Sequence, residues 1–215
     1  MALTPLRRLQ LRDTAYHLLC ARLEALLDPN PADPWPRHHQ HFGASLALTA
    51  RAYRQVGGLP EKCFLEDEAL CHSLYRHDLA VRHSPHVQVL TSARRQGRVE
   101  VGLSWQLREW LHMSREQREP QVPNPTELAA RWLLRRQLRH YWASRPTQQH
   151  QGLAMRLGLP ALALLARVQR AATFGELWQG LLDSAVVAPL TTVPLAQALL
   201  ELPVLIKQYS LQKAA

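Results

Sequence analysis

The sequence predicts an α/β protein in which a partial sheet of few strands with flanking helices is followed by an α-helical C-terminal region. Two observations predict this class. Between residues 35 and 92, short apolar runs of strand character alternate with helical segments, which is the order of an α/β layer. Beyond residue 120, apolar residues follow helical spacing, interrupted by prolines and glycines. With 47% hydrophobic residues in 215, the chain has enough apolar surface for a sizeable core.

An amphipathic helix is predicted over residues 6–27, because apolar residues recur there at three- and four-residue spacing. Asp28 and the prolines after it end this pattern. A proline-rich connector at residues 29–36 leads to a short buried strand predicted at residues 45–48. Thr49 is suited to cap the helix that follows.

That short helix runs to Val56, and Gly57 and Gly58 are suited to end it in the left-handed conformation. Another helix is predicted to begin at the acidic residues 66–68, since the N-terminus of a helix favours negative charge. Two strands are predicted after it, at residues 79–82 and 87–91.

The remaining elements are predicted to be helices, and the chain divides near residue 120. A polar loop at residues 92–102 precedes the first of them, over residues 103–116. The other predicted helices cover residues 126–143, 150–170, 174–183 and a last segment that ends near Gln208. The predicted organisation is a linking helix and connector at 1–34, a half domain at 35–120 and a helical region at 121–215.

The charge balance and the cysteines indicate the compartment and the kind of partner. The chain has 26 Lys and Arg against 17 Asp and Glu, and much of the excess lies in residues 123–172, where eight arginines face one acid. Three cysteines without paired spacing favour a reducing compartment. The first residues carry charges too early for a signal peptide or an anchor, so we expect a cytoplasmic protein.

Self-sufficient catalytic motifs are absent from the sequence. It contains no G-x-G-x-x-G, P-loop, G-x-S-x-G or C-x-x-C, and its six aspartates never fall two residues apart, so there is no D-x-D. What remains is an ordered set of short motifs, with Gly43-Ala44-Ser45 opening the predicted strand at 45–48. The others are Ala52-Tyr53, Val56-Gly57-Gly58-Leu59-Pro60, Leu65-Glu66-Asp67, Arg82-His83-Ser84-Pro85, Val87-x-Val89 and residues 91–98 (Thr-Ser-Ala-Arg-Arg-Gln-Gly-Arg).

In this order and spacing, the set resembles the acceptor-side half of a family-two glycosyltransferase of the GT-A fold, and the later motifs resemble a bacterial subgroup. The resemblance covers about residues 35–110. It implies inverting transfer of a sugar from a nucleotide-sugar to an acceptor hydroxyl, with Asp67 as general base and Glu66 beside it. It further implies that Gly57, Gly58 and His41 contact the acceptor.

The resemblance also assigns the donor diphosphate and a metal. Arg94, Arg95 and Arg98 would neutralise the diphosphate, because arginine matches phosphate oxygens. Enzymes of this family use Mg²⁺ or Mn²⁺, and His83 would complete the metal shell. Without a D-x-D, however, such a metal has little to hold it.

The nucleotide-binding half of the family has no counterpart in this sequence. We therefore expect little or no transferase activity from the chain alone, which fits a truncated or split enzyme. An exposed sheet edge would favour a homodimer or pairing with a separate nucleotide-binding half.

Two other functions stay open from the sequence. One is a noncatalytic interaction or scaffold domain derived from such an enzyme. The other is a basic helical protein that binds nucleic acid, because Arg131, Arg135 and Arg139 share one helical face with Arg136 beside them. No nucleic-acid recognition motif accompanies this stripe, so nucleic acid is the less favoured partner. Peripheral contact with anionic lipid head groups is an alternative explanation of the stripe.

Overall fold

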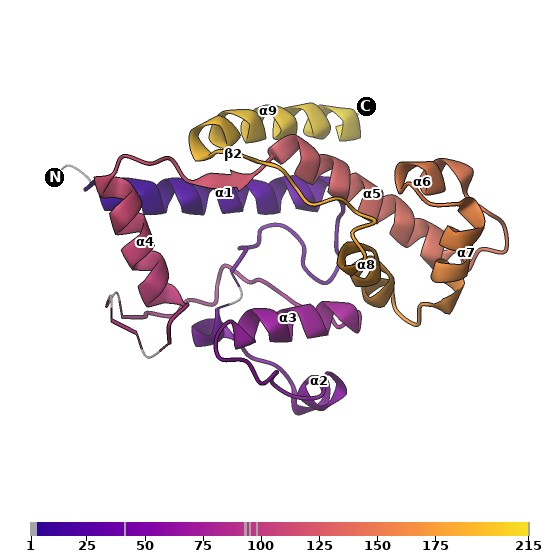
Figure 1. The fold of residues 1–215 in the computed structure, drawn as a ribbon, viewed down its shortest axis with the longest axis horizontal. Coiled ribbons are helices and arrows are strands. Elements are labelled where there is room, and N and C mark those ends of the chain that lie inside the picture. The colour runs from indigo at the N-terminus through magenta and orange to yellow at the C-terminus, as the bar shows by residue number, and fades with distance from the viewer. Residues whose placement is uncertain (1–3, 41, 93, 95, 98, 215) are drawn as a thin grey trace.

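The computed structural model describes residues 4–40, 42–92, 94, 96–97 and 99–214, and it consists mainly of helices (Figure 1). Its sheet has two three-residue strands, β1 (Gln121–Pro123) and β2 (Thr192–Pro194), which pair antiparallel with Val122 opposite Val193. A helix-rich mixed class is therefore confirmed. The helices are α1 (Pro5–Leu27), α2 (Ala50–Gln55), α3 (Glu66–Arg76), α4 (Leu103–Arg115), α5 (Pro125–Ala143), α6 (Gln151–Arg156), α7 (Ala161–Arg170), α8 (Phe174–Asp183) and α9 (Leu195–Ala214), and a 3-10 turn spans Gly43–Ser45.

The first hydrophobic core lies between α1, α5 and α9, which pack against one another (Figure 1). Leu23 of α1 and Leu195 and Leu202 of α9 are fully buried in it. The hydroxyl of Tyr16 donates to the carbonyl of Pro123 at 2.9 Å, which attaches α1 to β1. Helix α1 thus shares a core with the C-terminal helices, and the linking role expected for residues 1–34 stays a prediction.

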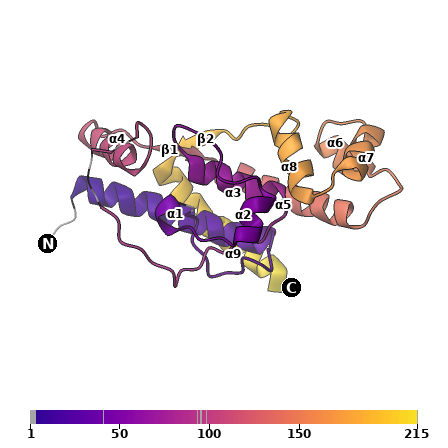
Figure 2. The same ribbon diagram turned by 90° about the horizontal axis from the view of Figure 1, so that it is seen from below.

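A second core lies at the other end of α5, where α6, α7 and α8 surround it (Figure 2). Leu138 of α5, Leu164 of α7 and Leu181 of α8 are fully buried there. Because α5 contributes Trp132 to the first core and Leu138 to the second, it joins the two.

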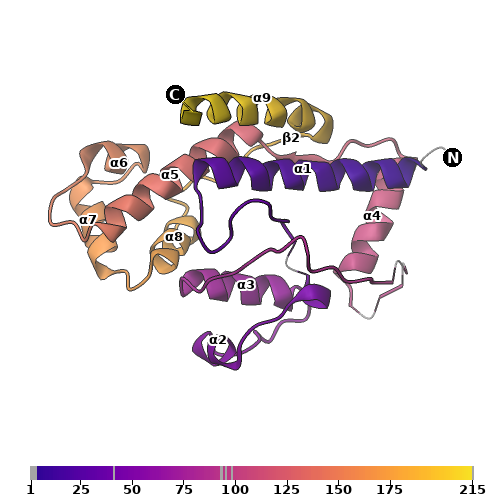
Figure 3. The ribbon, with the colours of Figure 1, turned by 180° about the vertical axis from the view of Figure 1, so that it is seen from behind.

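Helices α2 and α3 lie on the side of α1 that faces away from α9 (Figure 3). The end of α3 is attached to the start of α8 through Asp78, whose carboxylate accepts the backbone N–H groups of Phe174 and Gly175 at 2.6 and 2.8 Å. A Cβ on Gly175 would lie 1.8 Å from the carbonyl oxygen of Tyr75. Only glycine therefore permits this close approach of the two helices.

The strands predicted at 45–48, 79–82 and 87–91 are not formed, and this part of the prediction is wrong. Residues 42–92 are described without a gap and contain no strand. Leu48 and Val89 are exposed instead of buried. A strand requires a neighbour for its backbone groups, and β-like composition alone does not supply one. The strands that do form are β1 and β2, which carry prolines at positions 123 and 194.

Most predicted helices are confirmed to within a residue or two, since their limits depend on local caps. Thr49 accepts the N–H of Ala52 at 3.1 Å, as expected of a cap, and Gly57 and Gly58 have φ of +83° and +90°. The single helix predicted over 150–170 is instead two helices. The first ends before Gly158, which has φ of +62°, and the second begins after Pro160, its N-cap residue.

Candidate functional site

Asp67 lies in the first turn of α3 and connects that helix to the 3-10 turn at Gly43–Ser45. Its Oδ2 accepts the backbone N–H of Gly43 at 2.6 Å, and its Oδ1 accepts the N–H of Glu68 at 2.8 Å. The side chain is half-buried. The structure therefore brings together the motifs at 43–45 and 66–67, which belong to one ordered set in the sequence.

The other acceptor-side residues have simpler local roles. Glu66 is exposed at the start of α3. The N–H groups of Gly57 and Gly58 donate to carbonyls of α2 and so end that helix, and Gly58 faces the ring of Tyr53. Neither glycine takes part in the contact between Gly43 and Asp67. His41 lies outside the described residues.

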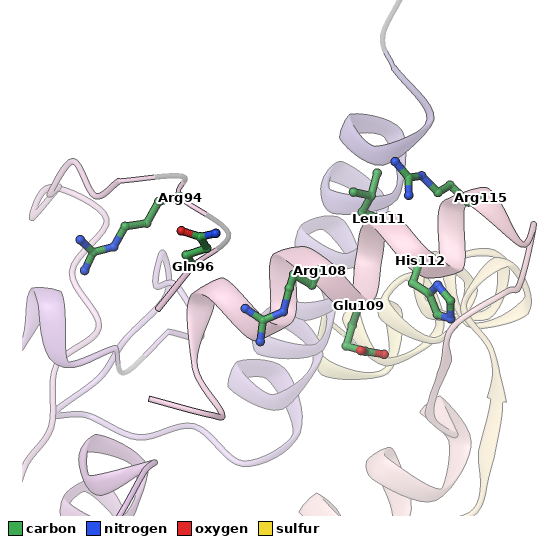
Figure 4. Close-up of a pocket in the computed structure, with 7 residues that line it drawn as sticks. All are labelled: Arg94, Gln96, Arg108, Glu109, Leu111, His112 and Arg115. Carbon is green, nitrogen blue, oxygen red and sulfur yellow. The ribbon is translucent and has the colours of Figure 1, made fainter. Parts of the chain in front are cut away.

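Of the three arginines predicted to bind a diphosphate, Arg94 is described, whereas Arg95 and Arg98 lie outside the described residues. Arg94 is exposed and lines an open depression of about 790 Å³ on the side of α4 (Figure 4). A second cavity of about 430 Å³ lies beside the end of α1 and is lined in part by Trp35. Asp67 lines neither of these two cavities.

His83 is buried and held by Asp33. Its backbone N–H donates to Asp33 Oδ1 at 2.9 Å, and its Nδ1 lies 2.8 Å from Asp33 Oδ2. Burial raises the pKa of Asp33, but hydrogen bonds from His83, Arg37 and Arg82 outweigh it and lower the pKa to about 2. The Nε2 of His83 lies 3.5 Å from the hydroxyl of Tyr75. Both ring nitrogens of His83 thus face protein groups.

This environment does not fit the metal implied by the resemblance. Across the residues that the structure describes, no group of three or more His, Cys, Asp or Glu side chains is arranged to hold an ion. Asp33, the carboxylate next to His83, is already shared with two arginines.

The basic stripe predicted on α5 is largely neutralised within the protein. Arg135 pairs with Glu24 at 2.6 Å and also with Asp28, whose side chain is fully buried. Arg139 pairs with Asp28 as well, and Arg131 donates to the carbonyl of Ala188. These arginines connect helices, which leaves them poorly placed to bind an external polyanion.

The same pairs continue into a chain of alternating charges across the molecule. Arg37 bridges Glu24 of α1 and Asp33 of the connector, with 2.7 Å to Asp33. Arg82 pairs with Asp33 at 3.0 Å and donates to the carbonyls of Pro34 and Pro36. In order, this network of ion pairs links Arg139, Asp28, Arg135, Glu24, Arg37, Asp33 and Arg82.

Sequence reasoning missed the acids on which this network depends. Asp28 and Asp33 were assigned only to the end of a helix and to a connector. The partners of Asp28 lie 107 to 111 residues away. Of the partners of Asp33, Arg37 follows four residues later, whereas Arg82 and His83 lie 49 and 50 residues away. Local spacing therefore marks one pair of this network, and the other signal is that both acids lie in a proline-rich stretch.

Comparison with known proteins provides no further assignment. No protein family matches the chain, and neither a curated protein nor a solved structure shows significant similarity to it. None of the helices in the described ranges combines the length and apolar character that a membrane span requires.

Proposed function

We propose that the chain forms the acceptor side of a GT-A-type inverting glycosyltransferase, with Asp67 as the general base. The supporting observation is the 2.6 Å hydrogen bond from the Gly43 N–H to Asp67 Oδ2. It joins two motifs that are 24 residues apart in the sequence and that border the acceptor in the family the chain resembles. A half-buried carboxylate at the start of a helix suits a base that must stay ionised near neutral pH.

In the proposed reaction, Asp67 removes the proton from the acceptor hydroxyl while the hydroxyl oxygen bonds to the anomeric carbon. The bond from that carbon to the diphosphate oxygen breaks on the opposite face, and the diphosphate leaves with the electron pair. The two backbone hydrogen bonds do not exhaust the carboxylate, because each of its oxygens has a second lone pair. A hydroxyl can therefore still approach it.

The donor half must come from elsewhere in this proposal. The sequence has no D-x-D, and the surroundings of His83 do not fit a metal. A separate nucleotide-binding half would supply both the donor site and its charge stabilisation. Glu66, which is exposed beside the base, is available to orient the acceptor. A Cβ at Gly57 would meet no atom within 4 Å, so the space beside this glycine is open.

A noncatalytic scaffold is the second candidate, and it has its own supporting observation. Both carboxylate oxygens of Asp67 already accept backbone N–H groups, and the residue lines neither of the two cavities described above. In that case Asp67 only fastens the 3-10 turn to α3.

Transfer from radiolabelled nucleotide-sugars in lysates distinguishes the two candidates. Lysates would come from cells that normally produce the protein, from cells lacking its gene, and from deletion cells that express wild type, Asp67→Asn or Glu61→Gln. We expect the deletion to abolish one transfer activity. Wild type should restore it, and Asp67→Asn should restore it roughly 10²- to 10⁴-fold less, the range for loss of a general base.

Glu61→Gln is the matched control, because it removes an exposed negative charge from the segment before α3, outside the proposed site. It should retain most of the activity. Thermal melts of each purified variant would separate loss of the base from loss of the fold. Equal complementation by Asp67→Asn and wild type would exclude the catalytic role and leave the scaffold.

A further inference from the structure

The cavity of about 430 Å³ lies between the end of α1 and the proline-rich connector that follows this helix. From α1 it is lined by Arg22, Ala25 and Leu26, whose three- and four-residue spacing places them on one face of the helix. The rest of the lining comes from the connector, at residues 29–31 and 33–35. The volume falls within the range of small-molecule pockets, so the cavity is large enough for one small organic ligand.

Trp35 has a fixed backbone but an exposed side chain in this lining. The carbonyls of Pro34 and Pro36, on either side of it, both accept from the guanidinium group of Arg82, at 2.6 and 2.9 Å. Asp33, two residues earlier, is held by its own buried ion pairs. Trp35 is nevertheless 45% exposed. A large aromatic side chain on a fixed backbone loses little further freedom when a ligand covers it, so Trp35 is a preorganised platform.

Apolar groups make up most of the wall around Trp35. This wall contains the side chain of Leu26 and three proline rings, those of Pro29, Pro31 and Pro34. Proline has a fixed φ, so such a wall loses little entropy when a ligand orders it. Aromatic rings prefer stacked or edge-to-face contacts with one another. The wall therefore favours a ligand with an aromatic ring.

Arg22 and Asn30 supply hydrogen-bond donors to the cavity. Arg22 is exposed and, among the described residues, has no ion pair or side-chain hydrogen bond, whereas Arg37 pairs with Glu24 of the same helix α1. The Oδ1 of Asn30 accepts the N–H of Ala32 at 3.0 Å, which leaves the amide NH₂ group as a donor. A free cation beside an amide donor is complementary to an anionic group.

Asp33, the acid in the lining, has no acceptor position left for a ligand. Its Oδ1 accepts from the N–H of His83 at 2.9 Å and from Arg82 at 3.0 Å. Its Oδ2 accepts from Arg37 at 2.7 Å and lies 2.8 Å from the ring Nδ1 of His83. These contacts fill the roughly four lone-pair positions of a carboxylate. A polyol, which needs acceptors as well as donors, therefore fits this lining less well than an anion does.

We propose that this cavity binds an aromatic carboxylate, with its ring against Trp35 and its carboxylate at Arg22. Arg22 lies one helical turn, about 5.4 Å, before Leu26, so a short arylalkanoate extends from the guanidinium group to the apolar wall. The amide of Asn30 adds a second donor. The site is independent of the proposed function, because Asp67 does not line this cavity.

The test follows the indole N–H signal of Trp35 by proton–nitrogen NMR while the whole chain is titrated with hydrocinnamate. The chain has six tryptophans, and the spectrum of Trp35→Phe identifies the indole signal that belongs to Trp35. This signal should shift saturably with a Kd of about 0.1 to 1 mM, as expected for a ligand of this size. Hydrocinnamamide, the neutral analogue, should bind about tenfold more weakly, because it forms no ionic contact with Arg22.

Two variants separate the contact with the carboxylate from the contact with the ring. Arg22→Gln should weaken binding of hydrocinnamate about tenfold and leave binding of hydrocinnamamide unchanged. Trp35→Ala should abolish measurable binding of both, whereas Trp35→Phe, which keeps a ring, should retain most of it. Saturation-transfer NMR of the ligand follows the two Trp35 variants. Because Arg22 is exposed, its variant should fold even if Trp35→Ala does not.

Arg170→Gln and Trp105→Ala are the controls, and both should leave binding unchanged. Arg170 is exposed at the end of α7, Trp105 is 37% exposed on α4, and neither lines the cavity. Thermal melts would show that each variant is folded. The proposal is overturned if hydrocinnamate at about 10 mM, tenfold above the weakest expected Kd, does not shift the Trp35 signal. It is also overturned if Arg22→Gln weakens binding of the acid and of the amide equally.

Discussion

The carboxylate of Asp33 holds His83 at two points, since its Oδ1 accepts the backbone N–H at 2.9 Å and its Oδ2 lies 2.8 Å from the ring Nδ1. The two residues are 50 positions apart. Asp33 also pairs with Arg37 and Arg82, while its own side chain is only 2% exposed. This carboxylate therefore anchors the segment after α3 to the connector after α1.

Replacing Asp33 by Asn should destabilise the protein strongly. The variant removes the one buried negative charge that Arg37, Arg82 and His83 share, and breaking a buried charged pair costs about 3 to 5 kcal/mol. Urea denaturation followed by circular dichroism would measure the change in unfolding free energy. Asp183→Asn is the matched control, since Asp183 pairs with Arg76 at 3.0 Å but is 57% exposed. An exposed pair contributes at most about 1 kcal/mol, so equal losses for both variants would contradict this assignment.

Stability should fall with acidification in two separate ranges. Burial, followed by the nearby His83, lowers the pKa of His38 below 6.5. The unfolded chain then binds more protons, so stability decreases as the pH falls below about 6.5. The pKa of Asp33 falls from 3.8 to about 2, because hydrogen bonds outweigh its burial. Its contribution is present above pH 3.8 and is lost as the pH falls towards 2.

Urea titrations between pH 7.5 and pH 2.5 would test both ranges, at increments of about half a unit so that each proton uptake is resolved. The His38→Gln variant should show a smaller loss in the upper range and keep the lower one, because burial also lowers the pKa of His17, which contributes to the same range. A wild-type stability that rises on acidification from neutral pH would contradict the assignment of His38.

Two glycines of α8 should respond in opposite directions to alanine. Gly175→Ala places a Cβ 1.8 Å from the carbonyl oxygen of Tyr75, and separating α3 from α8 should cost about 1 to 3 kcal/mol. Gly180 has no atom within 4 Å of its Cβ position and lies inside the helix. Gly180→Ala should therefore stabilise the protein by about 0.5 to 1 kcal/mol. Thermal melts of both variants would reveal the difference, and a shift of equal sign would contradict the close approach of α3 and α8.

The arginines of α5 should matter for stability rather than for nucleic-acid binding. Arg135→Gln removes one of the two arginine partners of Glu24 and of the buried Asp28, and should cost about 3 kcal/mol, the lower end of the range for a broken buried pair, because Arg37 and Arg139 remain. Its effect on a salt-dependent gel shift with duplex DNA or RNA should equal that of the exposed control Arg170→Gln. A specific loss of nucleic-acid affinity in Arg135→Gln, with stability intact, would restore the alternative function.

The sequence by itself determined most helices, but not the division of residues 150–170 into α6 and α7, nor the end of α9, which was expected near Gln208 and lies at Ala214. The limits of α1, α3, α5 and α8 depend on caps, prolines and spacing within a few residues, so local pattern is enough to predict them. The motifs at Gly43 and Asp67 belong to one ordered set in the sequence, but the strand expected to open at Gly43 is a 3-10 turn, and its 2.6 Å contact with Asp67 is a finding of the structure. The catalytic role of Asp67 stays a prediction.

Only the tertiary structure decided which segments form the sheet and which charges are structural. The three strand-like runs before residue 92 remain unpaired, whereas residues 121–123 and 192–194 pair across 71 positions of sequence, counted from Val122 to Val193. The spacing of Arg135 and Arg139 predicts a binding stripe, but in the fold both arginines pair with Asp28. Strand pairing and ion pairing both require a partner from a distant part of the chain, and local composition carries no information on which partner that is.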